Sequence, residues 1–151
     1  MKLLSLTANN PAFHSIFFKD GINIIVGKQV APLNENDGNT YNGVGKSLTL
    51  HLIHFCLGAN KIPSFSQMLP DWEFTLTFEI DGEQYVVTRN TKDQTKINFC
   101  GEQKSLTEMR AKLLELCFGI SESPKNMTWN TLFSRFVRRF PSCYATFDSY
   151  V

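Results

Sequence analysis

Residues 42–47, Asn-Gly-Val-Gly-Lys-Ser, have the types and the spacing that bind a chain of phosphates. Gly43 and Gly45 have no Cβ, so their backbone N–H groups can come close to phosphate oxygens. The Lys46 ammonium would contact the β- and γ-phosphates, and the Ser47 hydroxyl would hold Mg²⁺. A helix that begins near Lys46 would direct the positive end of its dipole at the same anion. We therefore predict that ATP and Mg²⁺ are bound by Asn42, Gly43, Val44, Gly45, Lys46, Ser47 and Leu48, with Ser47 as the metal ligand.

The segments on either side of this motif are those that a phosphate-binding loop requires. Residues 22–26 are nearly all apolar, which predicts a strand covered on both faces, and Gly27 ends it. The apolar run at residues 48–57, which stops at Gly58, predicts a buried helix. A strand, a glycine-containing loop and a helix therefore follow one another in the required order.

The loop itself departs from the usual motif. A phosphate loop of this kind has a further glycine five positions before Gly45, and this chain has Thr40 there. The polar, turn-rich residues 28–42 are accordingly interpreted as an insertion in the phosphate loop, about thirteen residues longer than the usual connection. The alternative is a chance Gly-x-Gly-Lys-Ser sequence at an ordinary helix N-terminus.

Alternation of apolar and polar residues predicts antiparallel strands in the middle of the chain. Residues 74–80 alternate cleanly, Asp81-Gly82 predicts a tight hairpin turn, and residues 84–89 return. Further strands are expected at residues 3–6, 15–18 and 96–100.

Two helices are predicted after the strands. Ser105 and Glu108 have the spacing of a capping box, and Gly119 has the position of a helix stop. A second helix with an aromatic face is expected from Trp129 to Phe140. We therefore predict one α/β domain at residues 1–151, with an antiparallel β lobe at 72–100 and a helical part at 105–140.

The composition is that of a folded domain without a strong charge. Of the 151 residues 42% are hydrophobic and 19% are charged, which excludes a disordered tail. The formal net charge of +1 gives no general attraction to nucleic acid, so any DNA contact would be local.

Cysteine spacing and hydropathy indicate the cellular compartment of the protein. None of the four cysteines forms a Cys-x-x-Cys pair, which argues against a zinc site, and two of them lie on apolar helix faces. The apolar run at the N-terminus stops at Leu6, which is too short for a signal peptide. No stretch approaches the ~20 apolar residues of a membrane span. We expect a reducing, cytoplasmic location and no contact with a membrane.

Three arginines and two histidines are further candidates. Arg135, Arg138 and Arg139 lie at the end of the second predicted helix. They either complement the helix dipole as solvated side chains or contact DNA phosphates. His51 and His54 share a helix face, but no third ligand is near in the sequence, so a metal site is not predicted.

Residues 42–47 resemble the Asn-Gly-x-Gly-Lys-Ser motif of SMC-, RecF- and RecN-like ATPases, the DNA-repair branch of the ABC superfamily. Residues 13–18 and 21–27 are similar to the strands that lead into the phosphate loop of these heads. Residues 54–58 and 132–139 resemble a bacterial subfamily of SMC-like ATPases that is linked to multi-gene anti-phage defence systems. The similarity covers about residues 1–140.

The resemblance implies the N-terminal half of an ABC/SMC-type head, a P-loop NTPase fold with a mixed sheet beside an antiparallel β lobe. It also implies two partners, a C-terminal ATPase lobe joined through a coiled coil and a second head that completes each ATP site. The signature motif, the Walker B acid, the switch histidine and the Q-loop glutamine of these heads are not found in the sequence. The resemblance therefore implies that the chain carries half of an ATPase site, and no catalytic residue is assigned.

Two other functions remain open. One is a catalytically inactive nucleotide-binding or interaction module, or a truncated product that regulates a full-length partner. The other is a stand-alone P-loop kinase or small NTPase, which predicts parallel βαβ units after the phosphate loop.

Overall fold

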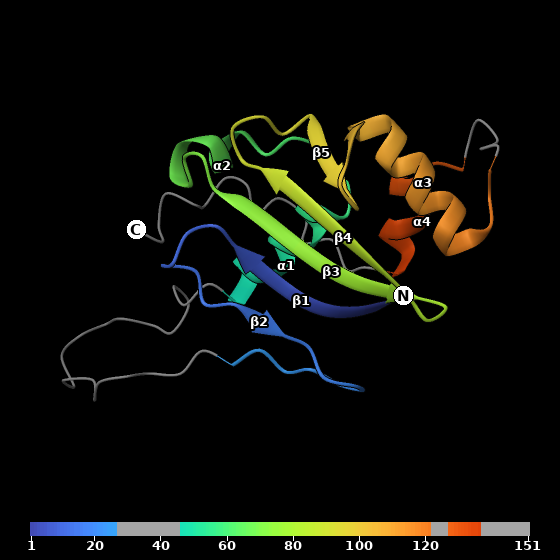
Figure 1. The fold of residues 1–151 in the computed structure, drawn as a ribbon, viewed down its shortest axis with the longest axis horizontal. Helices are drawn as coiled ribbons and strands as arrows, with labels where there is room; N and C mark the ends of the chain where they lie inside the picture. Colours follow the sequence, from blue (N-terminus) through green and yellow to red (C-terminus); the bar gives the residue numbers. More distant parts are fainter. Residues whose placement is uncertain (27–45, 122–126, 137–151) are drawn as a thin grey trace.

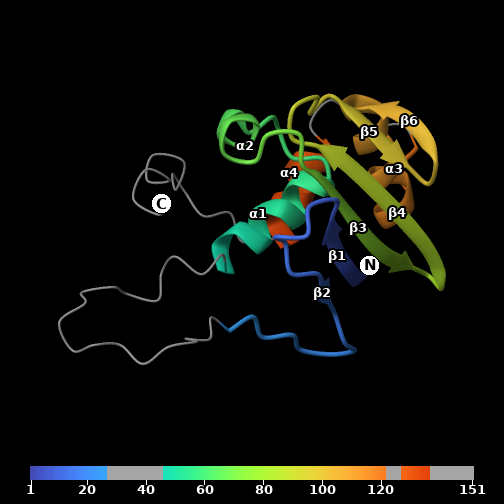
Figure 2. The ribbon, with the colours of Figure 1, turned by 60° about the vertical axis from the view of Figure 1, so that its left-hand side comes forward.

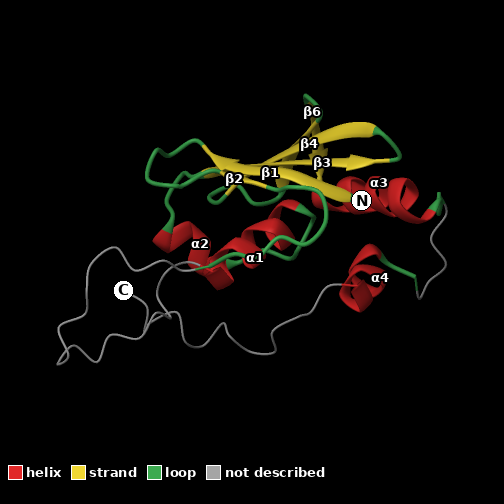
Figure 3. Ribbon diagram, turned by 90° about the horizontal axis from the view of Figure 1, so that it is seen from below, coloured by secondary structure: helices red, strands yellow, loops and turns green. Residues whose placement is uncertain are grey.

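The protein, in a computed structural model that describes residues 1–26, 46–121 and 127–136, forms one six-stranded sheet with helices on one face (Figure 3). The strand order is β2-β1-β3-β4-β5-β6, and every neighbouring pair is antiparallel. The strands are β1 (Lys2–Ala8), β2 (Ile16–Phe17), β3 (Glu73–Ile80), β4 (Glu83–Asn90), β5 (Lys96–Phe99) and β6 (Glu102–Ser105). The helices are α1 (Lys46–Cys56), α2 (Pro63–Met68), α3 (Leu106–Phe118) and α4 (Trp129–Phe136) (Figure 1).

The predicted central hairpin is confirmed. β3 and β4 pair from Glu73 with Asn90 to Ile80 with Glu83, and the turn between them is Asp81-Gly82. Because side chains alternate between the two faces of a strand, every second residue of β3 points into the core. The inward-facing residues of the three central strands are fully or almost fully buried; they are Leu6, Phe74, Leu76, Phe78, Ile80, Val87 and Arg89.

The helices are where the sequence places them, with one addition. α1 packs against β3 and β4, and α3 packs against β5, β6 and α4. The capping box of α3 is present: the Glu108 carboxylate accepts from the Ser105 N–H at 2.7 Å, and the Ser105 hydroxyl accepts from the Glu108 N–H at 3.3 Å. Gly119 ends this helix in the left-handed conformation, with φ of 65°. Figure 2 shows α1 beside the central strands β1 and β3, with β5 and β6 at the edge of the sheet farthest from β2.

The prediction of a strand at residues 22–26 is wrong. These residues form an extended loop outside the sheet, and their aliphatic side chains are exposed, to 92% for Ile22 and 80% for Ile24. A strand needs a neighbour that accepts and donates its backbone hydrogen bonds, and no described strand lies beside this segment. High β-propensity alone does not form a strand.

Other parts of the fold differ from the expectations or lie outside the described residues. α2 and β6 are not predicted by the sequence pattern. The described sheet is wholly antiparallel, so the parallel strands of the expected mixed sheet are not among these residues. The structure does not describe residues 28–42, which are interpreted as an insertion. It also does not describe residues 137–140, where the last helix is expected to end. No described helix is both long enough and apolar enough to cross a bilayer.

The three described cysteines lie in different environments. Cys56 is buried, and burial raises the pKa of its thiol to about 12. Cys117 is half-buried, and burial raises the pKa of its thiol as well. Cys100 is exposed at the turn between β5 and β6, at φ of 51°.

Of these three cysteines, we expect a thiol reagent at pH 8 to modify Cys100 first, Cys117 more slowly and Cys56 only after unfolding. With a pKa of about 12, roughly one Cys56 thiol in ten thousand is a thiolate at that pH, and the side chain is inaccessible. Peptide mass spectrometry after timed labelling with N-ethylmaleimide measures the order, and labelling in denaturant is the control. Early modification of Cys56 in the native protein would contradict the packing of α1.

Candidate phosphate-binding site

The first turn of α1 is the part of the predicted site that the structure describes. α1 is described from Lys46 onward, so the helix that the sequence predicts after the motif is confirmed. Ser47 is exposed, Leu48 is half-buried and Thr49 is buried. The first turn of an α-helix has backbone N–H groups without partners inside the helix, so it can receive an anion. Asn42, Gly43, Val44, Gly45 and the Lys46 side chain lie outside the described part of the chain.

The rest of α1 is fixed in the core. Leu52, Phe55 and Cys56 are fully buried against the sheet, and the Cys56 Sγ donates to the Phe74 carbonyl oxygen at 3.7 Å. The ring of Phe55 meets that of Phe65 from α2 edge to face, with 5.3 Å between centroids. Leu50, at 40% exposure, marks the face of α1 that the core does not cover.

The C-terminal end of α1 receives a buried guanidinium, that of Arg89 from β4. Its Nη1 donates to the carbonyl oxygens of Phe55 at 2.6 Å and Ala59 at 2.9 Å. Its Nε and Nη2 donate to the Gln94 carbonyl oxygen at 2.9 and 2.7 Å. The guanidinium also lies over the Phe55 ring, 4.1 Å from the centroid. Burial lowers the pKa of Arg89 to about 10, so the side chain remains charged at neutral pH.

Two more donors reach the loop that follows α1. The Trp129 indole N–H donates to the Leu57 carbonyl oxygen at 2.7 Å. Arg110 of α3 donates to the Gly58 carbonyl oxygen at 2.8 Å and to the Asn60 side chain at 2.7 Å. Gly58 has φ of 84°, a conformation that side-chain-bearing residues rarely adopt. Elements from three parts of the chain therefore converge on the end of the helix opposite to Lys46.

Sequence reasoning missed Arg89. The alternation at residues 84–89 places Arg89 only at the end of a returning strand, although its position carries a signal. Arg89 follows Tyr85 and Val87 at a spacing of two, so it lies on the same face of β4 as these inward-facing residues. A charged residue at an inward position of a strand indicates a specific set of partners, because an unpaired buried charge is costly.

The other candidates are separate from the first turn of α1. The His54 ring meets Phe133 of α4 at 5.7 Å between centroids, and burial lowers the pKa of His51. Across the described residues there is no group of three side chains that would hold a metal ion. Arg135 is exposed in the last turn of α4. Arg138 and Arg139 lie outside the residues that the structure describes.

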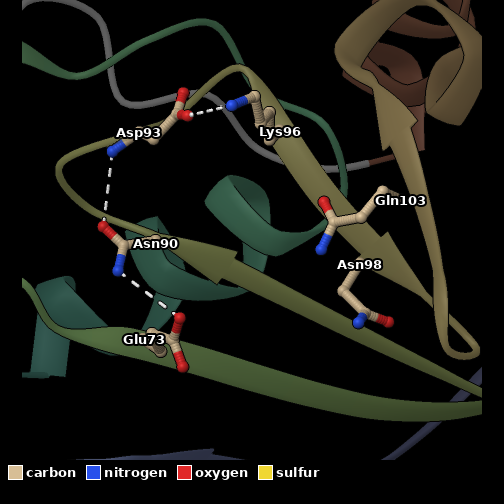
Figure 4. A pocket seen from close by; sticks show the side chains of 6 residues that line it. All are labelled: Glu73, Asn90, Asp93, Lys96, Asn98 and Gln103. Atoms are coloured by element: carbon tan, nitrogen blue, oxygen red, sulfur yellow. Dashed lines mark hydrogen bonds and ion pairs between the residues drawn. The ribbon is translucent and has the colours of Figure 1, made fainter.

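A shallow hollow of about 600 Å³ lies beside the turn between β4 and β5 (Figure 4). Its side chains already contact one another: Lys96 forms an ion pair with Asp93 at 3.2 Å, and Asn90 donates to Glu73 at 3.5 Å. The six residues around it are Glu73, Asn90, Asp93, Lys96, Asn98 and Gln103. The hollow contains one lysine and two carboxylates, so it does not have the positive charge that a phosphate site requires.

No family model matches this chain, and no curated protein matches it. The resemblance to SMC-like heads therefore rests on the motifs in the sequence.

Proposed function

We propose that this chain is the ATP-binding lobe of an SMC-like, DNA-associated ATPase that acts in DNA repair or phage defence in the cytoplasm. ATP and Mg²⁺ would be held at the N-terminal end of α1 by the motif at residues 42–47, with Leu48 following it. Ser47 would be the protein ligand of Mg²⁺.

The motif at residues 42–47, which runs directly into the helix α1, is the observation that carries the proposal. Phosphate binding by such a motif requires a helix directly after it, and α1 is described from Lys46 onward. Ser47 is exposed in this first turn, where its hydroxyl is accessible to a metal ion. Behind it, the helix is held in the core by Leu52, Phe55 and Cys56. A rigid helix keeps its N–H groups aimed at one place.

The exposed aliphatic segment at residues 22–26 supports a partner lobe. Ile22, Ile24 and Val26 are 92%, 80% and 73% exposed, and Phe17 of the edge strand β2 is 73% exposed. Contiguous apolar side chains of this kind usually mark a surface that another polypeptide covers. In the proposal this polypeptide is the C-terminal ATPase lobe with its coiled coil. A second head would complete the site, so hydrolysis by the chain alone is not expected.

A stand-alone kinase or NTPase is less well supported. Such enzymes need parallel βαβ units after the phosphate loop. The chain that follows α1 instead forms the antiparallel strands β3 to β6 within the described residues. For DNA, the support is limited to the exposed Arg135, with Arg138 and Arg139 next to it in the sequence.

Thermal unfolding with and without Mg-ATP tests the nucleotide site. At about 100 times its dissociation constant, Mg-ATP is expected to stabilise the wild-type protein by about 2.7 kcal/mol. Lys46→Ala is expected to abolish this shift, because it removes the cation that contacts the β- and γ-phosphates. Lys61→Ala, which changes an exposed lysine in the loop after α1, is the matched control and should keep the full shift.

Two results would contradict the proposal. One is the absence of any shift in the wild-type protein at millimolar Mg-ATP. The other is an equal shift in the wild-type protein and Lys46→Ala, which would place the nucleotide elsewhere. Turnover of ATP by the chain alone would instead favour the stand-alone enzyme.

A further inference from the structure

We infer that two copies of this chain pair through an apolar surface at the β2 edge of the sheet. This surface, the edge patch, consists of Phe17 in β2 and residues 22–26. Pairing would not require ATP, because the edge patch includes no residue of the candidate phosphate site. The occupant of the patch is a second copy of the chain, which presents the same surface.

The side chains of residues 22–26 alternate in exposure, as in a strand with one free side. Ile22, Ile24 and Val26 are 73–92% exposed, whereas Ile25 between them is 37% exposed. Successive side chains of an extended backbone point to opposite sides, so the three most exposed ones share a side. They form an apolar face that points away from the domain, and the exposed ring of Phe17 adds to it.

The beginning of the segment is fixed by its own turn. The Asn23 Oδ1 accepts from the Lys19 N–H at 2.8 Å, and the Asn23 Nδ2 donates to the Lys19 carbonyl oxygen at 2.8 Å. Gly21 has φ of 82°, which a residue without Cβ adopts easily. Asp20 in the turn forms an ion pair with Lys2 of β1. A segment held in this way loses less conformational entropy on association than a free one does.

The edge patch is suited to burial in an apolar contact. Phe17 and residues 21–26 carry no charge, and the polar Asn23 side chain is already bonded within its own turn. Burial would therefore leave no charge unpaired and no side-chain amide without a partner. A two-fold axis brings the same patch of both copies together, so apolar side chains meet apolar side chains.

The other edge of the sheet has the features that prevent such pairing. β6 has the sequence Glu-Gln-Lys-Ser, and its Glu102 and Lys104 form an ion pair at 2.7 Å. Charged side chains of this kind protect an edge strand from pairing with another chain. β2 has Ile16 and Phe17 instead. The contrast between the two edges places the contact at β2.

The size of the edge patch fits a weak dimer. Its five apolar side chains expose roughly 600 Å² per copy, so a symmetric contact would bury about 1,200 Å², at the lower end of specific protein interfaces. An interface of this size must also offset the entropy that is lost on association. We therefore expect a dissociation constant of about 10–100 µM.

Sedimentation equilibrium from about 2 to about 200 µM, on both sides of this constant, tests the pairing. The wild-type chain is expected to change from monomer to mostly dimer. Ile24→Lys places a charge in the patch of both copies and is expected to raise the dissociation constant by about tenfold or more. Met68→Lys is the matched control, since Met68 is 41% exposed in α2, which lies apart from β2 in Figures 1 and 2. It should pair as the wild-type chain does.

Amide hydrogen exchange then identifies the surface that pairs. Raising the wild-type concentration over the same range should slow exchange in residues 16–26 and leave exchange in β6 unchanged. Circular dichroism shows whether Ile24→Lys is folded; should it not be, Ile22→Lys takes its place.

Three results would overturn the inference. The first is a wild-type chain that stays monomeric at about 200 µM, which would leave the proposed partner lobe as the occupant of the patch. The second is a dimer that the folded lysine variant keeps at wild-type affinity. The third is a dimer without slower exchange in residues 16–26. Since none of these measurements contains nucleotide, their failure is distinct from a failure of ATP binding.

Discussion

Replacing Phe74 by alanine is expected to lower the free energy of unfolding by about 3–5 kcal/mol. Phe74 is completely buried in β3, in the middle of the sheet. Its ring contacts Phe13 edge to face at 5.5 Å between centroids and lies 5.8 Å from that of Trp72. The substitution would remove most of a buried ring and leave a cavity between the sheet and α1, because the surrounding strands cannot close the gap.

Phe17→Ala is the matched control for this variant. It removes the same side chain from the same sheet, but Phe17 is 73% exposed in the edge strand β2. A surface substitution of this kind is expected to change stability by no more than about 0.5 kcal/mol. Urea unfolding followed by far-ultraviolet circular dichroism measures both variants. Equal losses in the two variants would contradict the assignment of the inward and outward faces of the sheet.

Trp129→Ala is expected to cost about 3–5 kcal/mol and to release α4 from the rest of the protein. Trp129 is 2% exposed, and its ring stacks on Phe133 at 4.7 Å between centroids. Its indole N–H donates to the Leu57 carbonyl oxygen just after α1. The one side chain therefore supplies both the packing of α4 and a hydrogen bond to the end of the candidate helix.

Trp129→Phe separates these two contributions. Phenylalanine keeps most of the ring contacts but leaves the Leu57 carbonyl oxygen without this donor, at an expected cost of about 1–2 kcal/mol. Fluorescence of Trp72, the other tryptophan, follows unfolding in both variants. A loss below about 1 kcal/mol in Trp129→Ala would mean that α4 does not belong to the folded unit.

The sequence predicts elements well where local signals and packing agree. The β3–β4 hairpin combines strict alternation with an Asp-Gly turn, and the structure has the predicted pairing. Ser105 and Glu108 form the predicted capping box, and Gly119 ends α3 as expected. In each case the residues that make the signal also make the contacts, so no distant segment is needed to interpret them.

Predictions fail where the partner is not visible in the local sequence. Residues 22–26 have the composition of a buried strand but remain exposed, because burial depends on a neighbour that the described residues do not provide. β6 has no apolar residue, and α2 buries only Phe65, so neither produces a periodic pattern. For the candidate site, the motif predicts the helix α1 but not the arginine that donates to its far end. Arg89 and Phe55 are 34 positions apart in the sequence, and only the folded chain brings them together.

The antiparallel sheet has a consequence for the length of the connection between β2 and α1. β2 ends at Phe17 beside β1, and α1 begins at Lys46 against β3 and β4, so both ends of the connection are held by the folded domain. The entropy lost on closing a loop grows only with the logarithm of its length. An extension by about thirteen residues, slightly less than a doubling, therefore costs about 0.6 kcal/mol. The stability of the fold therefore sets almost no limit on the length of this connection. Its length can be determined by the function of the segment instead.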